Sequence, residues 1–183
     1  MATPVKPARE GREKQRYGED GERLTAGCCV LREVLQFQPL PLPMSPHTWR
    51  APWCWRVAVL GDQDMGQGPG GQREVLMISS SADTSRWIFP KGGWETDETV
   101  EAAAQRETLE EAGVVVELRR QIGWFNVVNS AGRMTTRLCV FEAACVEQLD
   151  SWAEGSRQRK WMPIEDAKAC CKHEYMQEVL ALL

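Results

Sequence analysis

The chain is poor in the residues that build zinc sites. It has two histidines, His47 and His173, and its seven cysteines form no CxxC pair, so the sequence offers no zinc site. An odd number of cysteines, with two adjacent pairs in apolar surroundings, is typical of reduced thiols in the cytosol or the nucleus. We therefore expect a cytoplasmic or nuclear protein.

Long hydrophobic runs and an excess of positive charge are also lacking. No apolar run approaches the roughly 20 residues needed to cross a bilayer, and residues 1–22 have neither the apolar core of a secretory signal nor the acid-poor composition of a transit peptide. The net charge of −4 gives no general attraction to nucleic acid or to an anionic membrane. We expect neither as a partner, and we expect a monomer.

What remains is an ordinary globular composition, with 43% hydrophobic and 26% charged residues in 183 positions. This length suits one domain, which we place at 23–183 after a flexible arm at 1–22. Residues 35–55 contain five of the ten prolines, and 61–72 is rich in glycine. We therefore interpret 35–72 as a surface insertion, with a short extra strand at 55–60. The alternative is a gene-model error, because the flanking strands join smoothly without it.

Hydrophobic patterns predict strands and helices in alternation. Strands are expected at 24–34, 73–81, 86–90, 114–128 and 134–146, with a short strand and a helix start within 156–167. A helix is expected at 98–112, capped by Thr96 or Asp97 and ended by Gly113, and one or two helices follow at the C-terminus. This order predicts an α/β fold with a mixed sheet between helices.

Three acids stand near the end of the first predicted helix, where they are unfavourable. A helix C-terminus carries partial negative charge, and like charges three or four residues apart repel. At about 100° per residue, Glu107, Glu110 and Glu111 share an arc of about 100°, opposite Ala102 and Leu109, which are expected to pack on the sheet. Either this face is simply solvated, or divalent cations such as Mg²⁺ or Mn²⁺ bind to it.

The residues before the helix favour the metal interpretation. Lys91 supplies a charge for phosphate, and Gly92 and Gly93 let the backbone approach an anion or present a carbonyl to a metal. An ordinary glycine turn would be the better interpretation if this loop stood alone. Arg106 is placed to orient Glu107 through a charge-assisted hydrogen bond.

The spacing of these residues resembles a known motif at every position. Gly92, Glu98, Arg106-Glu107, Glu110-Glu111 and Gly113-Val114 match the Nudix box, with Thr108 where the family usually has an aliphatic residue. The resemblance implies an α/β/α sandwich and metal-dependent hydrolysis of a phosphoanhydride. It also implies that Glu107, Glu110, Glu111 and the Gly92 carbonyl bind Mg²⁺ or Mn²⁺, with one glutamate as the base for water. Arg106 would hold Glu107, and Glu98 would support the loop.

Segments outside the box resemble one branch of the family, the diphosphoinositol polyphosphate and diadenosine polyphosphate hydrolases and their plant-type relatives. These segments are 16–32, 74–114 and 157–167. The resemblance implies a phosphate-rich small-molecule substrate, for which the basic candidates are Arg16, Arg23, Arg86, Lys91, Arg157 and Arg159. The alternatives are hydrolysis of ADP-ribose or another nucleoside diphosphate derivative, and a Nudix-fold module that binds without catalysis.

Overall fold

The computed structural model describes residues 7–9, 11–34, 72–129 and 131–183. Their strands form one seven-stranded sheet in the order β3-β2-β1-β6-β5, with β4 paired to β1 and β7 paired to β2. The strands are β1 (Arg23–Val34), β2 (Gln72–Ser79), β3 (Trp87–Ile88), β4 (Lys91–Gly93), β5 (Val114–Val128), β6 (Met134–Gln148) and β7 (Arg159–Pro163). The β1–β6 pair is parallel and the other pairs are antiparallel, so the predicted mixed sheet is confirmed.

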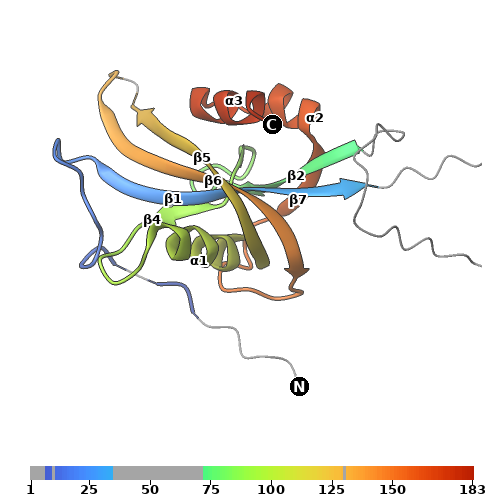
Figure 1. Ribbon diagram of the computed structural model, residues 1–183, viewed down its shortest axis with the longest axis horizontal. Helices are drawn as coiled ribbons and strands as arrows, with labels where there is room; N and C mark the ends of the chain where they lie inside the picture. The colour runs from blue at the N-terminus through green and yellow to red at the C-terminus, as the bar shows by residue number, and fades with distance from the viewer. Residues whose placement is uncertain (1–6, 10, 35–71, 130) are drawn as a thin grey trace, which may run out of the picture.

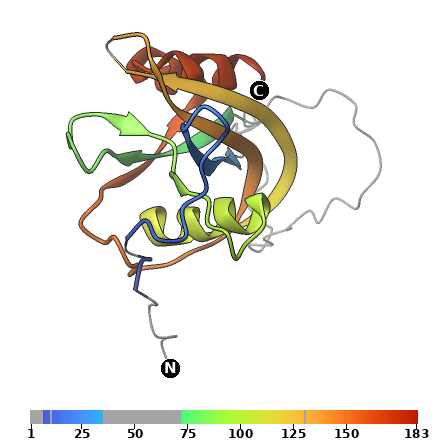
Figure 2. The same cartoon turned by 90° about the vertical axis from the view of Figure 1, so that its left-hand side faces the viewer.

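Helices cover both faces of this sheet. Helix α1 (Val100–Ala112) lies on one face, and α2 (Ile164–Cys170) and α3 (Glu174–Ala181) lie on the other (Figures 1 and 2). The core between the layers includes Leu76, Met77 and Ile78 of β2, which are completely buried because both faces of this central strand are covered. The three layers are the α/β/α sandwich that the resemblance implies.

The end of β1 lies next to the start of β2. Val34, the last residue of β1, pairs with Gln72, the first residue of β2. The predicted insertion thus includes one residue of β2, and the rest of it, 35–71, lies outside the described residues, together with the strand expected at 55–60. The chain leaves the sheet and returns to it at adjacent positions.

Helix α1 begins later than predicted. The N-cap is Thr99, whose side chain accepts a hydrogen bond from the amide of Ala102 at 3.2 Å, so the prediction of Thr96 or Asp97 as the cap was wrong. Asp97 is instead bonded to Lys14. The end of the helix is confirmed at Gly113, which adopts the left-handed conformation with φ 63°.

The buried face of α1 also differs from the prediction. Leu109 is 39% exposed and Ala102 is exposed, whereas Glu107 and Glu111 are buried. The other buried residues of the helix are small: Ala103, Ala104, Thr108 and Ala112. The acids can point inward because β4 and the chain around Arg157 provide hydrogen-bond partners for them, as described below. Thr108 satisfies its buried hydroxyl by donating to the carbonyl of Ala104 at 2.8 Å.

The residues just before β1, which were expected to belong to a flexible arm, are bonded to the rest of the fold. The side-chain amide of Gln15, which is buried, donates to the carbonyls of Arg16, Leu24 and Trp94. Arg16 donates to the carbonyls of Glu95 and Thr96, and its guanidinium lies 4.6 Å from the centroid of the Trp94 ring. This segment is therefore bonded to the connection between β4 and α1, which ties the loop to the sheet.

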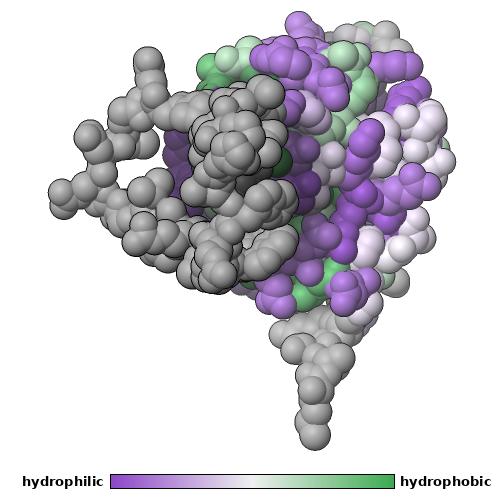
Figure 3. Space-filling view, turned by 90° about the vertical axis from the view of Figure 1, so that its right-hand side faces the viewer, coloured by the Kyte–Doolittle hydropathy of each residue, from purple (hydrophilic) through white to green (hydrophobic). Residues whose placement is uncertain are grey.

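No described helix is long and apolar enough to cross a membrane. On the face shown in Figure 3, the described residues are mostly hydrophilic, and hydrophobic ones form small separate areas.

We predict that Gly113→Ala destabilises the fold more than Gly132→Ala. Both glycines have positive φ, which costs an L-residue about 1–2 kcal/mol. A Cβ on Gly113 would also lie 2.8 Å from side-chain atoms of Trp152, whereas a Cβ on Gly132 meets nothing within 4 Å. Urea unfolding should therefore show an additional loss of about 1–3 kcal/mol for Gly113→Ala. Equal losses in the two variants would contradict the tight contact with Trp152.

Candidate active site

The site is built where β4 meets the centre of the sheet. Sequence analysis expected a loop at 91–97, but Lys91–Gly93 pair with Gly27–Thr25 of β1 as a short antiparallel strand. This close approach depends on Gly27, since a Cβ there would lie 2.6 Å from the carbonyl oxygen of Pro90. Strand β4 thereby fixes the backbone of the expected phosphate loop directly against α1.

Arg106 fastens the start of α1 to β4. Its guanidinium binds the Glu98 carboxylate through two hydrogen bonds of 2.9 and 2.7 Å, and it donates to the Gly93 carbonyl at 2.8 Å. Glu98 also accepts from the amide of Glu95 at 3.1 Å. The bidentate geometry fixes the direction of the guanidinium, so Glu98 supports the loop as expected.

The remaining nitrogen of Arg106 holds two further carboxylates. Its Nη1 donates to Oε1 of Glu107 at 2.8 Å and lies 3.3 Å from Oε2 of Glu110. These two acids are therefore gathered around one guanidinium nitrogen. The contact between Arg106 and Glu107 is the one that sequence analysis expected.

Glu111 faces the interior and joins α1 to β4 and to the chain just before β7. Its carboxylate accepts from the backbone amide of Lys91 at 2.7 Å and from Arg157 at 2.7 Å. Burial raises the pKa of Glu111 to about 7, although Lys91 and Arg157 act in the opposite direction. Both carboxylate oxygens are thus engaged, and the proposed role of Glu111 as a metal ligand stays a prediction.

The Glu107 carboxylate lies directly against Gly92, and we call the surroundings of this contact, where the resemblance implies a cation, the cation cradle. A Cβ on Gly92 would overlap the Glu107 carboxylate, so this close approach requires glycine. Burial also raises the pKa of Glu107, and the charge of Glu110 adds to this effect, while Arg106 opposes it. A nearby cation would relieve both the burial cost and the repulsion.

The donor set fits a hard divalent cation. Glu107, Glu110, Glu111 and the Gly92 carbonyl offer only oxygen, which suits Mg²⁺ or Mn²⁺. In the part of the chain that the structure describes, no three acidic, histidine or cysteine side chains already converge as a metal site. A cation here would therefore take other ligands from water or from substrate phosphates, as Mg²⁺ commonly does.

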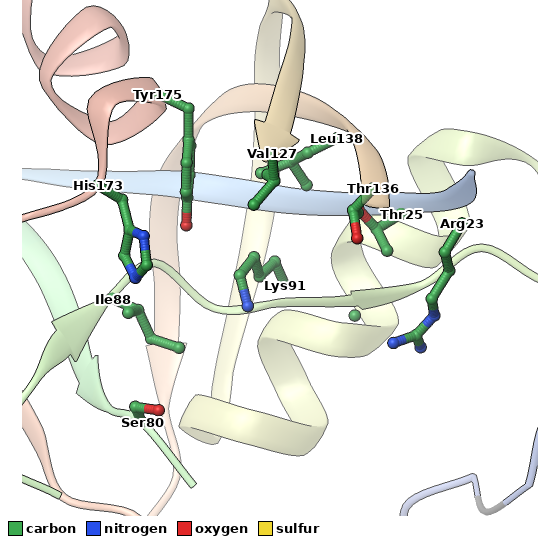
Figure 4. A pocket seen from close by; sticks show the side chains of 11 residues that line it. Arg23, Thr25, Ser80, Ile88, Lys91, Val127, Thr136, Leu138, His173 and Tyr175 are labelled. Carbon is green, nitrogen blue, oxygen red and sulfur yellow. The ribbon is translucent and has the colours of Figure 1, made fainter. Parts of the chain in front are cut away.

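A pocket of about 250 Å³ opens beside this cradle. Its residues come from the sheet and from the C-terminal segment: Arg23, Thr25, Ser80, Ile88, Lys91, Gly92, Val127, Thr136, Leu138, His173 and Tyr175. Figure 4 shows the Lys91 side chain extending into the middle of it. No described carboxylate forms an ion pair with the Lys91 ammonium. Burial lowers the pKa of Lys91, although the charges of Glu111 and Glu107 oppose this effect, so an anionic group in the pocket would stabilise the charged ammonium.

The structure divides the predicted basic residues into two groups. Arg23 and Lys91 line the pocket. Arg86 does not, because it borders a neighbouring depression and is paired with Asp83 at 2.9 Å. Arg157 bridges Glu111 and Glu154.

Arg159 has a different task at the end of α1. It donates to the carbonyls of Ala112 and Gly113 at 2.8 and 3.3 Å and packs over the Trp152 ring. It therefore supplies the positive charge that the last turn of the helix lacks.

Sequence analysis missed several pocket residues, above all His173 and Tyr175. Tyr175 stands at helical spacing with Val179, which is the pattern of a core residue. Both lie far from the motif in sequence, and only the packing of α3 on the sheet brings them to Lys91. No local signal marks them.

Residues 64–183 match the NUDIX domain family. The chain belongs to this family. It is 37% identical to the Arabidopsis thaliana protein "Nudix hydrolase 16, mitochondrial" over 180 residues, which cover 94% of this chain and 85% of that protein. It is also 41% identical over 97 residues to the mouse diphosphoinositol polyphosphate phosphohydrolase 3-alpha, covering 51% of this chain and 57% of the mouse protein.

Solved structures show the same fold. The Caenorhabditis elegans Ap4A hydrolase, in a binary complex, aligns with a TM-score of 0.55 at 18% identity, over 87% of this chain and 93% of the other. The chain is thus a Nudix hydrolase, and enzymes of this family act on pyrophosphate bonds and use divalent cations. Because two Arabidopsis relatives are named mitochondrial, the cytoplasmic or nuclear location stays a prediction.

We predict that Gly92→Ala weakens Mn²⁺ binding by about 10–100-fold, a typical effect of disturbing the surroundings of metal ligands. The new methyl group would displace the Glu107 carboxylate. Calorimetric titration with Mn²⁺ measures the affinity, and circular dichroism checks the fold.

Gly123→Ala is the matched control, since its Cβ would meet only the Phe125 ring at 3.6 Å. Unchanged Mn²⁺ affinity in a folded Gly92→Ala protein would place the cation elsewhere.

Proposed function

We propose that this Nudix hydrolase is an Mg²⁺- or Mn²⁺-dependent pyrophosphohydrolase that cleaves a phosphoanhydride in a dinucleoside polyphosphate or a diphosphoinositol polyphosphate. The observation that carries the proposal is the juxtaposition of opposite charges. Carboxylates gathered by Arg106 lie on one side of Gly92, and the unpaired Lys91 ammonium lies in the pocket on the other. A polyphosphate chain bridged to the acids by a cation would satisfy both.

Names of similar proteins support this substrate range. The mouse relative is a diphosphoinositol polyphosphate phosphohydrolase, and the fold neighbour from Caenorhabditis elegans is an Ap4A hydrolase. Hydrolysis of ADP-ribose or another nucleoside diphosphate derivative is the second candidate. It uses the same bond type and differs only in the group next to the phosphates.

The residues of the site have separable tasks. Lys91 and Arg23 would neutralise substrate phosphates, and the glycines of β4 let those phosphates come close to the backbone. Water attacks one phosphorus of the anhydride, the bridging P–O bond breaks, and Glu107 or Glu110 takes the proton of the water. Arg106 would hold that carboxylate in position throughout. A bound divalent cation supplies charge neutralisation and makes the water a stronger nucleophile.

We predict that Glu107→Gln and Glu110→Gln each lower kcat by about 10²–10⁴-fold, the range expected for loss of a catalytic base. The assay is Mg²⁺-dependent phosphate release from a panel of dinucleoside polyphosphates, diphosphoinositol phosphates, ADP-ribose and nucleotide sugars. Glu101→Gln is the control, because Glu101 is an exposed residue in the first turn of the same helix.

Full turnover in either site variant would remove that glutamate from the machinery. A wild-type protein that binds these compounds but hydrolyses none of them would favour the non-catalytic module.

A further inference from the structure

The pocket has two chemically different ends. Figure 4 shows Arg23, Thr25 and Thr136 at one end and Ser80, Ile88, His173 and Tyr175 at the other, with Lys91 between them. The first end lies against Gly92 and the cation cradle. The second end is formed where α3 packs over the sheet, and the catalytic proposal makes no use of it.

Tyr175 places an unused hydrogen-bonding group at this second end. Its side chain is 4% exposed, and its hydroxyl is the buried side-chain polar atom without a hydrogen-bond partner among the described residues. Leaving a buried polar group unpaired costs about 1–3 kcal/mol. The neighbouring residue Met176, with Val179 and Leu180, anchors α3 in the core, and the Tyr175 hydroxyl is directed at the pocket (Figure 4).

The surroundings fix what this hydroxyl can do. Burial raises the pKa of Tyr175, so the hydroxyl remains protonated and can donate. The His173 ring lies beside it, with ring centroids 5.8 Å apart. Burial and the nearby charges of Lys91 and Arg86 lower the pKa of His173, which keeps the imidazole neutral at pH 7.

The walls of this end suit an uncharged ring better than a phosphate-covered one. Ile88 at this end is apolar, Ser80 and Tyr175 are uncharged, and Val127 and Leu138 add apolar surface beside Lys91, which is the nearest cation that lines the pocket. The next cations, Arg86 and Lys172, border the neighbouring depression instead. An inositol ring bearing phosphates all round would need cations on every side, whereas a nucleobase offers apolar faces and neutral acceptor atoms.

The size of the pocket points the same way. Its volume of about 250 Å³ lies just below the ~300–1,000 Å³ typical of small-molecule sites. It therefore suits one nucleoside unit, with the polyphosphate extending past Lys91 toward the acids of α1.

We propose that Tyr175 determines specificity by donating a hydrogen bond to a neutral acceptor of a nucleobase, so that the enzyme prefers dinucleoside polyphosphates to diphosphoinositol polyphosphates. The inference rests on the proposed function, of which it selects one substrate class. Tyr175 binds the part of the substrate away from the reacting phosphorus, so its loss should raise KM and leave kcat nearly unchanged.

The test is Tyr175→Phe, which removes the hydroxyl and keeps the ring. On a diadenosine polyphosphate, kcat/KM should fall about tenfold, which corresponds to ~1.4 kcal/mol for one lost hydrogen bond. This fall should come from a higher KM. On a diphosphoinositol polyphosphate it should not change. The melting temperature should not decrease, because the lost hydroxyl has no hydrogen-bond partner among the residues that the structure describes. A merely structural role would not produce this pattern.

Tyr17→Phe serves as the control, since Tyr17 is 52% exposed and does not line the pocket. Identical kinetics of Tyr175→Phe and wild type on the dinucleotide, or a wild-type preference for the inositol substrate, would overturn the inference.

Absence of any metal-dependent hydrolysis by the wild type would overturn the proposed function instead. Calorimetric binding of adenosine monophosphate to the wild type and to Tyr175→Phe then still decides the role of Tyr175. Weaker binding by the variant supports it, and equal binding or no binding by both proteins overturns it.

Discussion

The guanidinium of Arg106 is the interaction on which the rest of the site depends. It joins the loop carboxylate Glu98, the carbonyl of Gly93 and the two helix carboxylates Glu107 and Glu110. One side chain thus sets the distance between β4 and α1 and also gathers the acids. A lysine has a single donor centre and could not hold five oxygens in fixed directions. The placement of the cation cradle next to the phosphate loop follows from this one planar group.

The acids at the end of α1 are explained by where the helix sits. Mutual repulsion and the helix dipole both disfavour them, yet each has an opposite charge or an amide directed at it. Arg106 serves Glu107 and Glu110, and Arg157 with the Lys91 amide serves Glu111. Arg159 meanwhile caps the helix carbonyls. The fold thereby supports a concentration of negative charge that an isolated helix would not keep.

Much of this site could be predicted because it is local in sequence. Residues on one helix have fixed angular relations, and the contact of Arg106 with Glu110, four residues further on, is the kind that this spacing favours. These angles do not show which side of the helix packs on the sheet. For that reason Leu109, which is exposed, was predicted on the wrong face. Strand β4 was not predicted because three residues are too few to show the alternation of apolar and polar residues that marks a strand. Arg157 and Tyr175 reach the site through sheet pairing and helix packing, which are long-range and leave no periodic signal.

The pairing of Val34 with Gln72 has a consequence for how this chain can vary. These two residues are held side by side by the β1–β2 pairing, so the length of the connection between them affects the sheet little. Each doubling of that length adds only about 0.6 kcal/mol of loop-closure entropy. Lys91 pairs with Gly27, seven positions earlier along the same strand. Changes in the length of this connection therefore leave the pairing of β4 with β1, and with it the position of Lys91, in place.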